Sequence, residues 1–293
     1  MRLISFLLDG EPRLGVEVGG HALAATELLK EGPRTMAELL TGGATVLDGL
    51  RGAARMDRIE AHGKPISELT LLAPLPRPGK VIGIARNYSD HAAEEGLTPP
   101  PEPVIFAKWP TAVIGPQAEI RWDPALTSQV DYEAELAVVI GSRARHVATA
   151  DALTHVLGYT CLNDVTARDL QFRDAQWMRG KSLDTFCPMG PVVVTSDELA
   201  EPGNLAISCL VNGAVVQAAR TSEMFFGVAA LISFCSRSFT LEPGDVIATG
   251  TPGGVGHNRK PPVYLGDGDE VVVAIEGIGE LVNICRFERP YGK

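Results

Sequence analysis

The segment DYEAELAVVIG, residues 131–141, joins an acidic beginning to an apolar end. Its unbroken apolar run, Leu136–Ile140, is typical of a strand that is buried on both faces. Because side chains alternate along a strand, Asp131, Glu133 and Glu135 are expected to project from one face, about 7 Å from one to the next. An exposed edge strand would leave these acids in water, but the apolar run favours an interior strand. Buried carboxylates need a partner, and a hard divalent cation held by oxygen ligands is the candidate.

A third oxygen ligand is expected from Asp164, which follows the apolar strand Val156–Leu162. Arg168 and Gln171 come four and seven residues after it and share one face of the helix that is predicted there. Asp164 could serve only as the N-cap of that helix, which is the commoner role of such an acid. An acid at a strand end, with a cation and an amide behind it, nevertheless favours a site. We therefore predict Arg168 and Gln171 as substrate-binding residues.

The segment RNYSDHAAEEG, residues 86–96, predicts a short helix on which the side chains of His91 and Glu94 can meet. A carboxylate beside an imidazole fixes its tautomer and raises its basicity, which suits a general base. The alternative is an ordinary surface ion pair. Gly83 and Gly96 on either side indicate a segment that is able to close over a pocket.

Lys181 lies in QWMRGKSLDTFCPMGP, among apolar and aromatic neighbours in the sequence. A partly desolvated lysine of this kind could stabilise an enolate or a carboxylate. Gly180-Lys181-Ser182 does not form a P-loop, because Ala175 stands where the first glycine is required. The segment DVIATGTPGGVG, residues 245–256, predicts a strand that runs into a glycine-rich turn. This turn could present Thr251 and backbone N–H groups to an anionic substrate.

Short apolar strands, separated by turns with Gly, Pro, Asn or Asp, must position these groups. They dominate the chain from residue 74, and strands and helices do not alternate as in doubly wound folds. We predict an α+β, β-rich fold with a rolled or sandwiched sheet over residues 74–293. Residues 1–73 are predicted to form a small α/β domain, with a hairpin at Asp9-Gly10 and the proline-rich joint PLPRPGK after it.

The composition of the 293-residue chain is typical of a soluble globular protein, with 45% hydrophobic and 21% charged residues. Its net charge of -10 would repel phosphates and argues against a nucleic-acid partner. The apolar stretches are too short for a membrane span or a signal peptide. Five scattered cysteines without C-x-x-C spacing indicate reduced thiols. We therefore expect a cytoplasmic protein with no membrane partner.

Five motifs in this order resemble the fumarylacetoacetate hydrolase family over residues 74–293: RNYSDH, DYEAELAVVIG, NDVTARDLQ, GKSLDTFCPMGP and GDVIATGTPGGVG. The resemblance is closest to the two-domain branch with oxaloacetate tautomerases and acylpyruvate hydrolases. It implies a β-roll catalytic fold, a homodimer, and one Mg²⁺ or Mn²⁺ per subunit on Glu133, Glu135 and Asp164. It also implies that His91 and Glu94 form a lid pair. The implied substrate-binding or metal-shell residues are Arg86, Gln171, Lys181, Thr185 and Thr251. Trp109, in Lys108-Trp109-Pro110-Thr111, departs from the family pattern and is a candidate for altering the pocket.

The resemblance supports three hypotheses about function, all with a small 2-oxo acid as the ligand. In the first, a Mg²⁺- or Mn²⁺-dependent hydrolase cleaves a C–C bond of an acylpyruvate-type β-diketo acid, such as fumarylpyruvate or acetylpyruvate, through a metal-chelated enolate. His91 would activate water, and Lys181 would stabilise the enolate. In the second, the same site decarboxylates or tautomerises oxaloacetate, or isomerises a 2-hydroxy-diene-dioate. In the third, the protein is a non-catalytic scaffold that binds a metal or a ligand.

Overall fold

The computed structural model describes residues 1–94, 96 and 98–288. Its larger sheet has twelve strands, with the main order β4-β3-β2-β1-β14-β12-β11-β17-β6-β7, while β5 pairs with β1 and β8 with β14. Its strands are β1 (Arg2–Leu8), β2 (Glu11–Val18), β3 (His21–Ala24), β4 (Lys64–Pro65), β5 (Leu71–Leu72), β6 (Val81–Ala85), β7 (Val104–Lys108), β8 (Val113–Ile114), β11 (Ala134–Ile140), β12 (Val156–Asn163), β14 (Cys187–Thr195) and β17 (Val246–Ala248).

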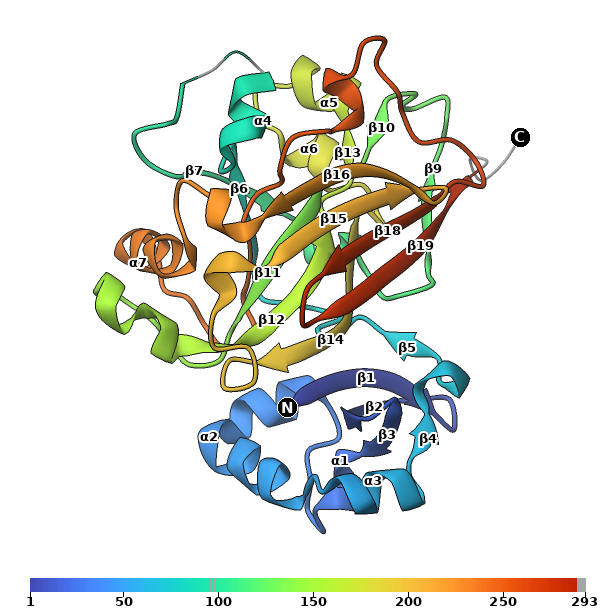
Figure 1. The fold of residues 1–293 in the computed structure, drawn as a ribbon, viewed down its shortest axis with the longest axis vertical. Coiled ribbons are helices and arrows are strands. Elements are labelled where there is room, and N and C mark those ends of the chain that lie inside the picture. Colours follow the sequence, from blue (N-terminus) through green and yellow to red (C-terminus); the bar gives the residue numbers. More distant parts are fainter. Residues whose placement is uncertain (95, 97, 289–293) are drawn as a thin grey trace.

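A second sheet has five strands in the order β16-β15-β18-β19-β9, and a small third sheet pairs β10 with β13. The second sheet packs across the central strands β11, β12 and β14 of the larger one (Figure 1). Apolar residues from both sheets share one core, so the predicted β-rich, sandwiched fold is confirmed. The strands of the second sheet are β9 (Glu119–Trp122), β15 (Ala206–Val211), β16 (Ala214–Arg220), β18 (Glu270–Ile275) and β19 (Gly279–Phe287). The third sheet comprises β10 (Val130–Asp131) and β13 (Thr166–Ala167).

Helices are short and lie around the sheets. They are α1 (Ala25–Leu28), α2 (Met36–Ala53), α3 (Met56–His62), α4 (Ser89–Glu94), α5 (Arg168–Arg173), α6 (Met178–Lys181) and α7 (Val228–Ser238). A break at Gly43, whose φ is +63°, divides α2. Among the described residues, no helix has the length and the apolar character that crossing a bilayer requires.

The N-terminal segment forms the lower part of the molecule in Figure 1, with α2 and α3 beside the hairpin of β1 and β2. The predicted turn at Asp9-Gly10 joins these two strands, which pair along their whole length. However, β1 also pairs with β14, where Leu3 lies opposite Val193. The hairpin thus extends the larger sheet. The boundary after residue 73 stays a prediction.

Strand β11 is the central element for the candidate site. It pairs with β12 on one side and with β17 on the other, and the run Leu136–Ile140 is fully buried. The predicted interior strand is therefore confirmed. Its alternate apolar residues belong to two different hydrophobic clusters, one on each face of the strand, which explains why they do not alternate with polar ones.

Replacing Leu136 with alanine should lower the free energy of unfolding by about 2–5 kcal/mol, because it leaves a cavity in this central strand. Leu126, which is 46% exposed, is the matched control. Leu126→Ala should change that free energy by less than about 0.5 kcal/mol. Urea unfolding of both variants at one fixed metal concentration measures the difference, and equal losses would contradict the central position of β11.

Candidate active site

Three carboxyl groups meet at the start of β11. Glu133 lies just before the strand, Glu135 lies within it, and Asp164 follows the end of β12. Antiparallel pairing places Ala134 opposite Asn163, and the Asp164 N–H donates to the Glu133 carbonyl at 2.9 Å. As a result, one ligand atom from each of the three carboxyl groups lies within 4.8 Å of the other two, and all three residues are buried.

Asp131 does not belong to this group, although the guanidinium of Arg168 contacts both Asp131 and Glu133. That it projects from the same face as Glu133 and Glu135 stays a prediction. Strand β10 pairs with β13 in the third sheet, whereas β11 belongs to the larger sheet. Asp131 instead accepts hydrogen bonds from the backbone N–H groups of Gly256 and His257, at 2.8 and 2.9 Å.

The alternative that Asp164 serves only as the N-cap of α5 is excluded. Strand β13 separates Asp164 from α5, whose N-cap is Ala167. Arg168 and Gln171 do share one face of α5, and the Arg168 guanidinium donates to Gln171 Oε1 at 3.2 Å.

Three buried cations surround the carboxyl groups. Lys181 Nζ lies 2.7 Å from both Glu133 Oε2 and Asp164 Oδ2. Arg168 Nη1 lies 2.7 Å from Glu133 Oε1. Lys108 Nζ contacts Asp164 Oδ1 at 2.5 Å and also donates to the carbonyl groups of Val165 and Lys181. Both oxygens of Glu133 and both of Asp164 therefore have a cationic partner, and this pairing permits their burial.

The two glutamates respond to these surroundings in opposite ways. Burial by itself raises the pKa of Glu133, but the attraction of Lys181 and Arg168 outweighs it and lowers this pKa to about 2. Burial and repulsion from Asp164 and Glu133 raise the pKa of Glu135 well above its ordinary value. Glu135 is consequently the carboxyl group that a proton or a bound cation must neutralise.

The chemistry of this donor set fits a divalent metal ion. The cluster provides carboxylate oxygens and no sulfur or imidazole, which is the preference of Mg²⁺ and Mn²⁺. One more positive charge is also needed here, because four carboxyl groups face three cations: Asp131, Glu133, Glu135 and Asp164 against Lys108, Lys181 and Arg168. Glu133, Glu135 and Asp164 would hold the ion.

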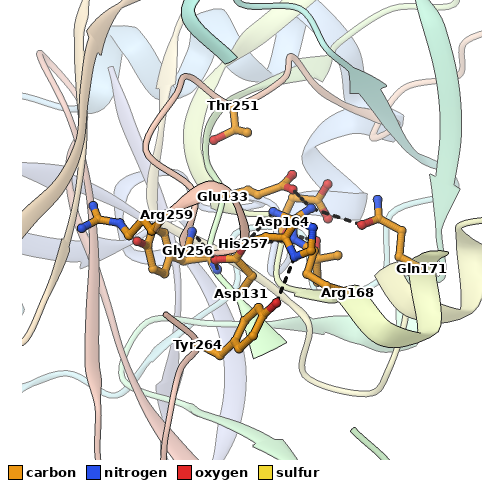
Figure 2. Close-up of polar contacts among 12 residues, drawn as sticks. Asp131, Glu133, Asp164, Arg168, Gln171, Thr251, Gly256, His257, Arg259 and Tyr264 are labelled. Carbon is orange, nitrogen blue, oxygen red and sulfur yellow. Dashed lines mark hydrogen bonds and ion pairs between the residues drawn. The ribbon is translucent and has the colours of Figure 1, made fainter. Parts of the chain in front are cut away.

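A small cavity of about 30 Å³ lies beside Glu133. Its polar lining includes Arg86, His91, Arg168, Gln171, Lys181 and Thr251. Its aromatic lining is Phe106, Phe172 and Trp177. Figure 2 shows Glu133 between Thr251 on one side and Arg168 on the other. The structure thus brings most of the predicted substrate-binding residues together, although their roles stay predictions.

Helix α4 covers this cavity and carries the predicted lid pair. His91 is buried, and its Nδ1 lies 3.9 Å from Glu94 Oε2. The interaction with His91 lowers the pKa of Glu94. Glu94 Oε1 also accepts the N–H of Gly254 at 2.9 Å. The pair is therefore more than a surface ion pair, because it connects α4 to the glycine-rich turn.

Two residues that were expected near the substrate lie elsewhere. The Thr185 hydroxyl exchanges hydrogen bonds with the backbone of Arg121, at 2.8 and 3.2 Å, and Thr185 does not line the described cavity. Trp109 is 53% exposed and is also absent from that lining. Neither position is explained by local sequence, because both side chains could have pointed inward.

Two further residues were not predicted. Lys108 ends the apolar strand β7, and a lysine after such a run was the available signal for its burial. Gln217 is buried and supports the glycine-rich turn: its amide nitrogen donates to Thr251 Oγ1 and to the Pro252 carbonyl, each at 2.8 Å. Its amide oxygen accepts the Ala134 N–H at 3.0 Å. No sequence signal marked Gln217.

Comparison with known proteins supplies the family. Residues 80–286 match the family model described as fumarylacetoacetate (FAA) hydrolase C-terminal. The chain belongs to the fumarylacetoacetate hydrolase family. It is 44% identical over 290 residues to human oxaloacetate tautomerase FAHD2A, mitochondrial, with 97% of this chain and 91% of that protein covered.

Solved structures share the whole fold. A fumarylacetoacetate hydrolase from Exiguobacterium antarcticum is 42% identical, with a TM-score of 0.85 over 98% of this chain and 100% of that one. Maleylpyruvate hydrolase from Sphingobium sp. SYK-6, in complex with manganese (II) ion and pyruvate, is 31% identical, with a TM-score of 0.79 over 99% of this chain and 100% of that one. The protein is therefore an enzyme of this family.

Metal binding should displace a proton from Glu135, because a protonated carboxyl group is a poor ligand. Below the raised pKa of Glu135, binding should release about one proton, and affinity should increase as the pH rises through that pKa. Calorimetric titration with Mn²⁺, in buffers that differ in heat of ionisation, measures the protons released. Glu135→Gln should weaken binding by at least about tenfold, whereas the exposed Glu280→Gln should not. Tight binding by wild type without proton release would contradict this assignment.

Proposed function

We propose that this protein is a Mg²⁺- or Mn²⁺-dependent oxaloacetate tautomerase, which interconverts the keto and enol forms of a small 2-oxo diacid. The observation that carries the proposal is its 44% identity, over 97% of the chain, to a protein named for this reaction. Identity to the hydrolases is lower, at 42% for the fumarylacetoacetate hydrolase and 31% for the maleylpyruvate hydrolase. Among the hypotheses from the sequence, the comparisons therefore favour the second over the hydrolase.

The size of the cavity supports a small substrate. A volume of about 30 Å³ has room for one or two water molecules, so even a four-carbon acid requires the lining to move. We propose that helix α4 is the element that moves, since it contributes His91 to the lining. A seven-carbon acylpyruvate would need a larger displacement than oxaloacetate.

The charges in the lining support a dianionic substrate. Arg86, Arg168 and Lys181 all line the cavity. Lys181 Nζ also lies 4.9 Å from the centre of the Phe106 ring, and Arg86 lies 5.7 Å from that of Trp177. These rings exclude water beside the cations, which strengthens their attraction for carboxylates.

In this reaction, a proton leaves C3 of the keto form and another is added to the oxygen at C2. A bound Mg²⁺ or Mn²⁺ would supply Lewis acidity for the charge that develops on that oxygen. His91 is the candidate to accept the C3 proton, and Glu94 holds the imidazole that becomes charged. Lys181 adds positive charge beside the developing enolate.

The hydrolase remains a second candidate, because the maleylpyruvate hydrolase fold is shared over the whole chain. The hydrolase reaction differs from tautomerisation in one chemical requirement. Hydrolysis needs a water molecule that His91 deprotonates for attack on a carbonyl carbon, whereas tautomerisation needs only proton transfer. The decarboxylase, the 2-hydroxy-diene-dioate isomerase and the non-catalytic scaffold stay predictions that the same assays test.

An assay panel distinguishes these activities. With oxaloacetate and Mn²⁺, the enzyme should accelerate the decay of enol absorbance to the same final equilibrium, without forming pyruvate. Chelation of the metal should remove this acceleration. Pyruvate release from acetylpyruvate or fumarylpyruvate, at a higher kcat/KM than the oxaloacetate reaction, would contradict the proposal and support the hydrolase.

Replacing His91 with alanine should lower kcat for tautomerisation by about 10²–10⁴-fold, because it removes the proton acceptor. Stopped-flow absorbance with metal at saturation measures kcat. His155→Ala is the control, since His155 contacts Ser142 outside the described cavity lining and should leave kcat unchanged. A His91→Ala enzyme with wild-type kcat would show that another group moves the proton.

A further inference from the structure

Asp131 is fully buried, yet it belongs neither to the carboxyl cluster nor to the cavity lining. Each of its contacts is with a hydrogen-bond donor. Oδ1 accepts the N–H groups of Tyr132 and Gly256, at 2.9 and 2.8 Å. Oδ2 accepts the His257 N–H at 2.9 Å and lies 2.9 and 2.8 Å from Nε and Nη2 of Arg168. Four of these are hydrogen bonds, and Nη2 adds an ion pair; a carboxylate is the one side chain of this size that can accept all four and carry the charge.

On one side, Asp131 acts on the candidate metal site through Arg168. The guanidinium of Arg168 spans two acids, with Nε and Nη2 on Asp131 and Nη1 on Glu133. Figure 2 shows Arg168 between Asp131 and Glu133 in this arrangement. Because the guanidinium is planar and rigid, its contacts with Asp131 fix the position at which Nη1 contacts Glu133.

On the other side, Asp131 holds the end of the glycine-rich turn. A side chain at Gly256 would place its Cβ 1.9 Å from the Val263 carbonyl oxygen and 2.8 Å from Asp131 Oδ1, so only glycine allows this approach. Two residues earlier, Gly254 donates its N–H to Glu94 of the lid pair. The Gly254 carbonyl also accepts the hydroxyl of Tyr132, the neighbour of Asp131, at 3.1 Å.

We infer that Asp131 is a positioning residue that couples the lid to the metal carboxylates. The connection runs from Glu133 through Arg168 to Asp131, then through the backbone of residues 254–257 to Glu94 and His91. Asp131 is not one of the candidate metal ligands and does not itself line the cavity. This inference rests on the proposed function for the role of the lid pair, but the connection itself does not depend on which 2-oxo acid reacts.

Asp131→Asn tests the coupling, because the amide nitrogen must face a donor whichever way the side chain turns. Two measurements need no turnover. Mn²⁺ affinity, from calorimetry without substrate, should fall by about 10–100-fold. Hydrogen exchange of peptides covering residues 89–94 and 250–257 should become faster. At saturating Mn²⁺, kcat should also fall by about tenfold or more with little change in KM, because the lid pair is displaced.

Asp245→Asn is the matched control. Asp245 is also fully buried and also accepts a backbone N–H, from Glu242 at 2.7 Å, while pairing with Lys80 at 2.6 Å. It adjoins the opposite end of β11, where its carbonyl accepts the Ile140 N–H. This variant should keep wild-type Mn²⁺ affinity and wild-type exchange of both peptides.

Wild-type Mn²⁺ affinity in Asp131→Asn, or unchanged exchange of either peptide, would overturn the inference. If this variant does not fold, Arg168→Lys replaces it: lysine keeps the charge but cannot span both acids, so the same losses are expected, and their absence is equally decisive. A protein inactive on oxaloacetate that still shows both losses would refute the proposed function and leave the coupling intact.

Discussion

The structure depends on the balance between buried acids and buried cations at the start of β11. Asp131, Glu133, Glu135 and Asp164 would each be costly to bury alone. Lys108, Lys181 and Arg168 offset most of that charge from three directions. The remaining carboxyl group, Glu135, has a raised pKa and can be neutralised by a proton or by a divalent cation. The buried cluster therefore needs one more positive charge to balance its carboxyl groups.

The two packed sheets make this balance possible. Strand β11 lies inside the larger sheet and is covered by the second one, so water cannot screen the charges at its beginning. Where water is excluded, the attraction within each ion pair is stronger, and a charged group without a partner is more destabilising. This explains why so many of the polar contacts in the site are made to charged groups or to backbone N–H groups.

The glycine-rich turn connects the lid pair on α4 to the carboxyl cluster. Gly250 and Gly254 both have φ values of +100°, a region that side chains rarely allow. This backbone lets Gly250 donate to Glu135 and Gly254 donate to Glu94. One short turn therefore contacts both the metal cluster and the lid. A substrate that displaces α4 would therefore also shift the carboxylates, through this turn. Such a connection suits an enzyme that must close before protons are transferred.

Much of the site could be predicted from the sequence, because its key residues belong to local patterns. An apolar run after Glu133-Ala134-Glu135 required a buried strand, and the strand before Asp164 ended at the same sheet edge. The pair His91 and Glu94 followed from helical spacing. These inferences needed only the geometry of one element at a time.

Tertiary structure decided what local geometry could not. Asp131 lies outside the carboxyl cluster, and its partners Arg168 and His257 are 37 and 126 residues away in the sequence. Lys108 and Gln217 joined the site, and Thr185 left it, through contacts across comparable sequence separations. The sequence by itself thus determined which residue types would form the cluster and on which elements. Which charges pair there was decided only by the packing of the sheets, since a buried charge takes its partner from whatever the fold places beside it.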